Sequence, residues 1–103
     1  MEFESLPEKV KAALPAIKSA LESKALPVWN SMNNQLVLFR IEEFALVLKN
    51  IATEYEFTYL HGYSVKLISE IENLELDRLK VTINFFPSII ELVSLLIKNQ
   101  INE

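Results

Sequence analysis

Apolar side chains recur at intervals of three and four residues along most of this chain, and this spacing constrains the fold more than any other feature. Residues three and four apart lie on one side of an α-helix, so such spacing predicts an amphipathic helix. The clearest run has a broad apolar face and comprises Ile41, Phe44, Ala45, Leu48, Ile51, Ala52 and Tyr55. Isolated helices of this length are marginal in water, so packing against other helices must supply most of the stability.

Three further stripes have the same period. They comprise Val10, Leu14, Ile17 and Leu21; Leu60, Tyr63, Leu67 and Ile71; and Leu76, Leu79, Ile83, Phe86, Ile90, Val93 and Ile97. Breaks are expected at 54–58 and at Asn73, and Asn33-Asn34 is expected to be a linker because Asn favours turns. Four helical segments with short connections predict an all-α fold, an up-and-down antiparallel four-helix bundle formed by a single domain over 1–103.

Prolines interrupt the first and last segments. Pro15 and Pro27 fall in the first third, which is therefore predicted to be a proline-broken helical arm that runs to about Asn34. A kink or a change between two short helices is expected near Ala13–Leu14. Pro87 lies inside the last stripe, so that helix is expected to bend or restart there.

Composition excludes several classes of protein. The 103 residues include one Gly and no Cys, so a glycine-rich phosphate loop, a disulfide scaffold and a thiolate zinc site are ruled out. The formal net charge is −4, and the ten basic residues form no run. Binding to nucleic acid is not expected, because phosphate neutralisation requires clustered Lys and Arg.

The sequence also predicts a cytoplasmic protein. Its first five residues, Met1-Glu2-Phe3-Glu4-Ser5, lack the basic-then-apolar order of a signal peptide. The most apolar stretch, Val81 to Ile97, contains Asn84, Pro87 and Glu91 and is short for a membrane span. Direct insertion into a membrane is therefore not expected.

His61 is the only histidine and the one candidate for chemistry at a side chain. It has no second histidine at metal-binding spacing, so no metal or cofactor is expected. The simplest interpretation places it half exposed beside the third stripe, with no catalytic role. The alternative is that His61 accepts a phosphoryl group, which calls for a Lys about one turn later and a small residue nearby. Gly62 and Lys66 are of these types but lie at other offsets.

Acidic pairs and aromatic residues are interpreted structurally. The pairs Glu42/Glu43, Glu54/Glu56 and Glu70/Glu72 cannot face one another on a helix, so they are expected on solvated surfaces. Trp29 is expected to anchor the helical arm. A cluster around the second connection is expected in core and turn packing, and comprises Tyr55, Phe57, Tyr59 and Tyr63.

Four short motifs in a fixed order give the chain a family resemblance. They are Leu26-Pro27-Val28-Trp29; Ile41 with Phe44-Ala45 and Leu48; Tyr63 with Leu67; and Phe86-Pro87 with Ile89-Ile90 and Leu92. Together they resemble the small C-terminal helical domain of many bacterial hybrid sensor histidine kinases and response regulators, over about Leu14 to Leu96. That family is similar in architecture to histidine-phosphotransfer domains.

The resemblance implies a function without implying catalysis. Histidine-phosphotransfer domains carry an HxxKG signature, and here Ser64 stands at the Lys position and Val65 at the Gly position. The implied role is a non-catalytic signalling module of a two-component phosphorelay, whose partner is a receiver or kinase domain. The chain would then be a fragment of a longer protein, which in a membrane-bound sensor kinase would be part of the cytoplasmic region.

Two alternatives stay open at this point. One is a true histidine-phosphotransfer domain that uses His61. The other is a free-standing helical adaptor, or a homodimer, that associates through exposed apolar residues such as Val37, Phe39 and Leu95.

Overall fold

The computed structural model describes residues 6–32 and 35–101, and every regular element within these ranges is helical. The predicted linker Asn33-Asn34 lies outside the described residues. In chain order the elements are α1 (Glu8–Ala20), the π-helical η2 (Leu21–Ala25), α2 (Leu26–Ser31), α3 (Leu38–Glu54), α4 (Thr58–Glu72), α5 (Leu76–Asn84) and α6 (Phe86–Ile101).

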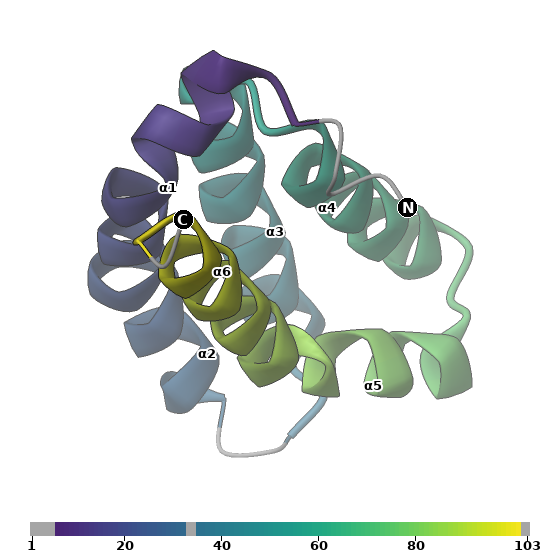
Figure 1. The fold of residues 1–103 in the computed structure, drawn as a ribbon. Helices are drawn as coiled ribbons and strands as arrows, with labels where there is room; N and C mark the ends of the chain where they lie inside the picture. Colours follow the sequence, from purple (N-terminus) through teal and green to yellow (C-terminus); the bar gives the residue numbers. More distant parts are fainter. Residues whose placement is uncertain (1–5, 33–34, 102–103) are drawn as a thin grey trace.

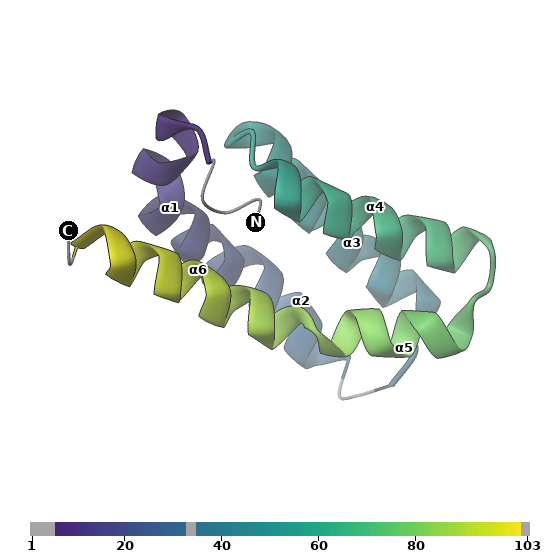
Figure 2. The same cartoon turned by 45° about the vertical axis from the view of Figure 1, so that its right-hand side comes forward.

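These elements form four helical segments arranged as a bundle. α1, η2 and α2 follow one another without a gap and form the first segment, which packs on α3 and on α6. α3 and α4 lie side by side as a helical hairpin, and α5 leads from the end of α4 across to α6 (Figures 1 and 2). The all-helical bundle predicted from the apolar stripes is therefore confirmed.

The core is built from the predicted stripes. Every member of the stripe from Val10 to Leu21 is buried. All members of the stripe from Ile41 to Tyr55 are buried too, except Tyr55, which is partly exposed. At the centre, the rings of Phe44 and Phe86 meet edge to face with their centroids 4.8 Å apart. Edge-to-face pairs add to the free energy gained by burial, so this contact between α3 and α6 is central to the bundle.

The change between two short helices, one alternative expected near Ala13–Leu14, is not found. α1 runs through Pro15 as one helix from Glu8 to Ala20. Pro15 is exposed, on the side of α1 away from the buried Leu14 and Ile17. The carbonyl that loses its hydrogen bond to the proline therefore lies on the solvent side, where water can hydrate it.

The irregularity of the helical arm lies instead before Pro27. Over Leu21–Ala25 the helix widens to a π-helix, and the Leu26 N–H donates to the Leu21 carbonyl, five residues earlier. Pro27 then occupies the first turn of α2, where its missing N–H is tolerated. The proline is thus accommodated by a change in helical pitch, and the chain remains helical on both sides.

The restart predicted at Pro87 is confirmed. α5 ends at Asn84, and α6 begins at Phe86 with Pro87 in its first turn. The restart changes which residues face the core: Ile89 and Val93 are buried, whereas Ile90 is only partly buried. Leu76, expected in the stripe, is exposed.

Residues 76–99 also have the length and apolar composition of a helix that could cross a membrane. A single helix that meets this criterion is weak evidence for a membrane span, so the expectation for Val81 to Ile97 stays a prediction. The same criterion is met by core helices of soluble proteins, and this stretch contributes Leu79, Ile83 and Phe86 to the core.

Two helices end in the same hydrogen-bonded cap. After α4, the Glu75 N–H donates to the Glu70 carbonyl and the Leu74 N–H to the Ile71 carbonyl, which is a Schellman motif. This cap requires a left-handed residue, and Leu74 supplies it with φ 54°. Glu56 has the same φ of 54° in the corresponding cap of α3. Neither position carries the glycine that this conformation favours.

Replacing Leu74 with glycine is expected to raise the free energy of unfolding by about 0.5–1 kcal/mol, because glycine adopts a positive φ without steric cost. Urea denaturation followed by circular dichroism measures the change. As a control, Glu72→Gly places the same residue inside the last turn of α4 and should destabilise the protein by a similar amount. A loss of stability in Leu74→Gly would contradict this account of the cap.

Candidate functional site

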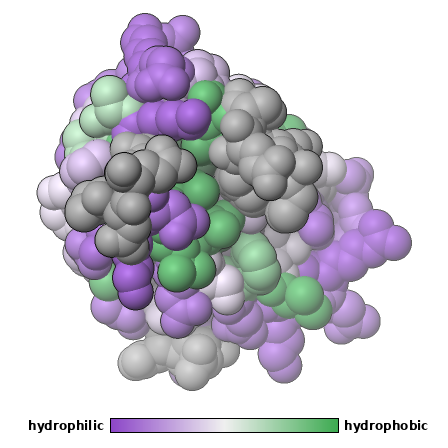
Figure 3. All heavy atoms as spheres, viewed as in Figure 1, coloured by the Kyte–Doolittle hydropathy of each residue, from purple (hydrophilic) through white to green (hydrophobic). Residues whose placement is uncertain are grey.

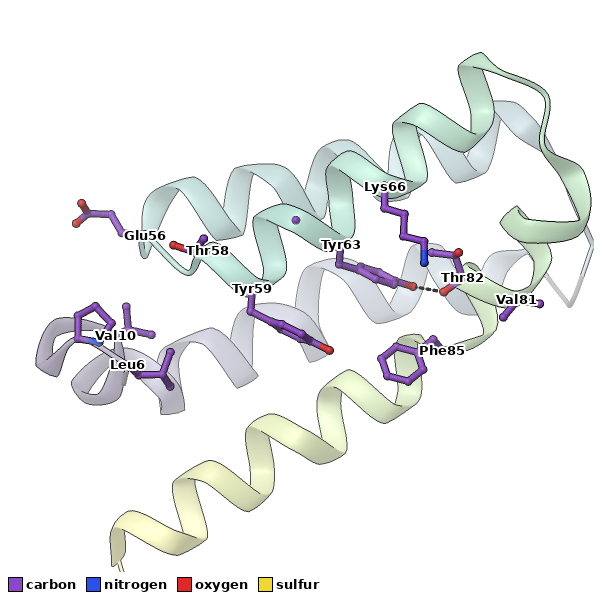
Figure 4. A pocket seen from close by; sticks show the side chains of 12 residues that line it. Leu6, Val10, Glu56, Thr58, Tyr59, Tyr63, Lys66, Val81, Thr82 and Phe85 are labelled. Atoms are coloured by element: carbon purple, nitrogen blue, oxygen red, sulfur yellow. Dashed lines mark hydrogen bonds between the residues drawn. The ribbon is translucent and has the colours of Figure 1, made fainter. Parts of the chain in front are cut away.

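A groove of about 830 Å³ is lined by α4 together with the start of α1 and the α5–α6 junction. Leu6 and Val10 form one end, Tyr59 and Tyr63 project from α4, and Phe85 lies across from them (Figure 4). In Figure 3, apolar residues run down the middle of this face. Small-molecule sites have this character, being concave and mostly apolar with few polar groups.

Most polar groups in the wall of this groove already bond within the protein. The Tyr63 hydroxyl donates to the Thr82 carbonyl at 2.6 Å, and the Thr82 hydroxyl donates to the Arg78 carbonyl at 2.9 Å. Burial of Tyr63, then the negative charge of Glu70, raises the pKa of the Tyr63 phenol well above its usual value. Tyr63 therefore stays protonated near neutral pH and is a fixed donor that joins α4 to α5.

Two charged side chains lie toward opposite ends of the groove. Lys66 extends from α4 toward Thr82, whereas Glu56 lies at the other end and points away from the hollow (Figure 4). Glu56 forms an ion pair with Lys9 of α1. No carboxylate among residues 6–32 and 35–101 lies within ion-pair distance of Lys66. Among the described residues that line the groove, Lys66 is therefore the one charged side chain without an ion-pair partner.

His61 lies on the exposed side of α4. Its carbonyl accepts a hydrogen bond from the buried Ser64 hydroxyl at 2.7 Å. Val65 is its exposed neighbour one turn along α4, and Lys66 projects from a different side of the helix, into the groove. The exposure could admit a protein partner, but α4 places no cation beside the imidazole.

Glu70 departs from the expected solvated position of the acidic pairs. Its side chain is buried, and its Oε1 has no hydrogen-bond partner within the described part of the chain. The expected surface position of the Glu70/Glu72 pair is therefore wrong for Glu70, while Glu72 is exposed. Glu70 follows Tyr63 by seven residues and Leu67 by three, so the helical period itself pointed to its buried side.

The aromatic residues fulfil most of the packing roles predicted for them. Trp29 Nε1 donates to the Ile83 carbonyl at 2.8 Å, and the indole lies against Phe86, so Trp29 fastens the helical arm to α5 and α6. Phe57 is fully buried. Tyr59 is partly buried, packs against the core with its ring 6.0 Å from that of Phe57, and also lines the groove.

A second candidate surface is the outer side of α3. Phe39 is 72% exposed and Leu46 is 49% exposed, and their separation of seven positions places both on one side of the helix. Charged residues surround them: Arg40 pairs with Glu43 at 3.6 Å, and Glu42 is exposed. Phe39 and Leu46, with Val37 at the N-cap of α3, are called the α3 face below. The predicted exposure of Val37, Phe39 and Leu95 is confirmed.

Within residues 6–32 and 35–101, no three His, Cys, Asp or Glu side chains lie close enough together to hold a metal ion. Comparison with protein-family models, curated proteins and solved structures finds no match to this chain. Its function must therefore be argued from the two surfaces and from the sequence motifs.

Proposed function

We propose that this chain is a non-catalytic interaction module of a two-component phosphorelay protein, which binds a receiver or kinase domain in the cytoplasm through the α3 face. Three observations support the proposal: the ordered motifs, the helical bundle, and the apolar side chains that α3 leaves in solvent. The exposure of Phe39 is the observation that carries it.

An exposed phenylalanine beside an exposed leucine is a typical docking surface. Fully burying one such side chain contributes about 1.5–3 kcal/mol, and apolar residues surrounded by charged ones are typical of the centre of a protein interface. The bundle itself gains nothing from leaving Phe39 in water. The ion pair between Arg40 and Glu43 lies at the edge of the α3 face, where it would add specificity to binding more than affinity.

The proposal predicts that Phe39→Ser weakens binding to a receiver domain of a two-component system by about tenfold or more, since aromatic residues dominate interface energies. Isothermal titration calorimetry measures the change. Leu74→Ser is the matched control, because Leu74 is also exposed but lies in the turn after α4. It should bind as the wild type does, and both variants should keep the wild-type circular dichroism.

Two results would contradict the proposal. Equal affinity of Phe39→Ser and the wild type would remove the α3 face from the interface. Transfer of an acid-labile phosphoryl group from the phosphorylated receiver to the chain, lost in His61→Gln, would instead identify a true phosphotransfer domain. The exposure of His61 is what keeps that second function worth testing.

A further inference from the structure

We propose that the groove between α4, α1 and the α5–α6 junction binds a small amphiphilic monoanion, an alkyl chain that ends in a carboxylate. This site does not depend on the proposed docking function, since its residues lie on other helices than the α3 face. Its volume of about 830 Å³ falls within the range of small-molecule sites.

The apolar body of the ligand is inferred from the state of the wall. Leu6, Val10, Val81 and Phe85 offer only carbon atoms to the hollow. The Tyr63 and Thr82 hydroxyls, which could have bound polar atoms, are committed to backbone carbonyls at 2.6 and 2.9 Å. A ligand with many polar groups would leave them unpaired on binding, which is costly, whereas an alkyl chain would not.

The single negative charge is inferred from Lys66. It is the one cation among the residues that line the groove, and its ammonium extends toward Thr82 at one end of the hollow (Figure 4). One ammonium can neutralise one carboxylate by a charge-assisted hydrogen bond. A dianionic phosphate would keep an uncompensated charge, because Lys66 is the one cation among the described residues that line the groove.

Gly62 explains how the hollow stays open. It lies on α4 within the lining of the groove, and a Cβ added there would meet no atom within 4 Å. A side chain added at position 62 therefore begins in open space and not against the packed core. Glycine also weakens a helix interior, so a substitution should stabilise α4.

The test is a titration of the ¹⁵N-labelled chain with sodium decanoate below its micelle concentration, followed by amide chemical shifts. We expect saturable shifts confined to residues of the groove, and little response to decyltrimethylammonium. Lys66→Met should weaken decanoate binding about three- to tenfold, as expected for a partly exposed ion pair. Lys49→Met, an exposed lysine of α3, is the charge-matched control and should bind as the wild type does.

Gly62→Leu should abolish binding while the chain stays folded, and Gly62→Ala should fold equally well and retain binding. The proposal is overturned by decanoate binding to Gly62→Leu, by equal affinity of Lys66→Met and the wild type, or by no saturable shift in the groove. A dimer of the wild type that disappears in Gly62→Leu would place a second copy in the groove and would also overturn it.

Discussion

Replacing Phe86 with alanine is expected to lower the free energy of unfolding by about 3–5 kcal/mol, a large share of the total stability of a domain of this size. Phe86 is fully buried at the start of α6 and meets Phe44 edge to face at 4.8 Å. The same ring lies 6.1 Å from that of Trp29, whose indole bonds to α5. Truncating Phe86 leaves a cavity where three helical segments meet, and we expect partial unfolding at 37 °C.

The adjacent residue provides the control. Phe85 is 47% exposed, so Phe85→Ala loses less buried area and leaves no enclosed cavity. We expect a loss of about 1 kcal/mol or less. Thermal and urea denaturation of both variants measure the difference. Equal losses of stability in the two variants would mean that Phe86 is no more buried than Phe85, which contradicts the position of Phe86 in the core.

Replacing Glu70 with leucine is expected to raise the free energy of unfolding by about 1–3 kcal/mol, which is unusual for a change at a buried position. The Glu70 side chain is only 4% exposed, and its Oε1 has no partner in the described part of the chain. A buried oxygen without a hydrogen bond loses its hydration and gains nothing in return. Leucine fills a similar volume without that cost.

Glu72→Leu is the matched control on the same helix. Glu72 is exposed, so its replacement should change stability by no more than about 0.5 kcal/mol. Urea denaturation at pH 7 compares the two variants with the wild type. A destabilised Glu70→Leu would show that this carboxylate has a structural partner and that its burial is favourable.

The helical class and most of the core could be predicted from the sequence, because burial follows the helical period closely in α1, α3 and α4. The prediction failed at Pro15, where the outcome depends on which side of the helix the ring lies. Exposed Pro15 left α1 intact, whereas Pro27 is preceded by a π-helix. Neither outcome can be inferred from local sequence without knowing which face is buried.

The groove could not be predicted, because Leu6, Tyr59 and Phe85 are distant in the chain and meet only through the tertiary arrangement. Glu70 was within reach of prediction, since its spacing from Tyr63 and Leu67 fits the buried side. A charged side chain is expected at the surface, but the packing of α4 buries Glu70. The exposure of Phe39 could be predicted, because Phe39 is not a member of the apolar stripe that begins at Ile41.

The central claim is that α3, and not the surface around His61, binds the signalling partner. The most direct test is a map of backbone amide shifts when the ¹⁵N-labelled chain is titrated with an unlabelled receiver domain of a two-component system. We predict that the perturbed amides cluster on the outer side of α3, around Phe39 and Leu46. Perturbation centred on His61 in α4, or no perturbation at saturating receiver, would contradict the claim.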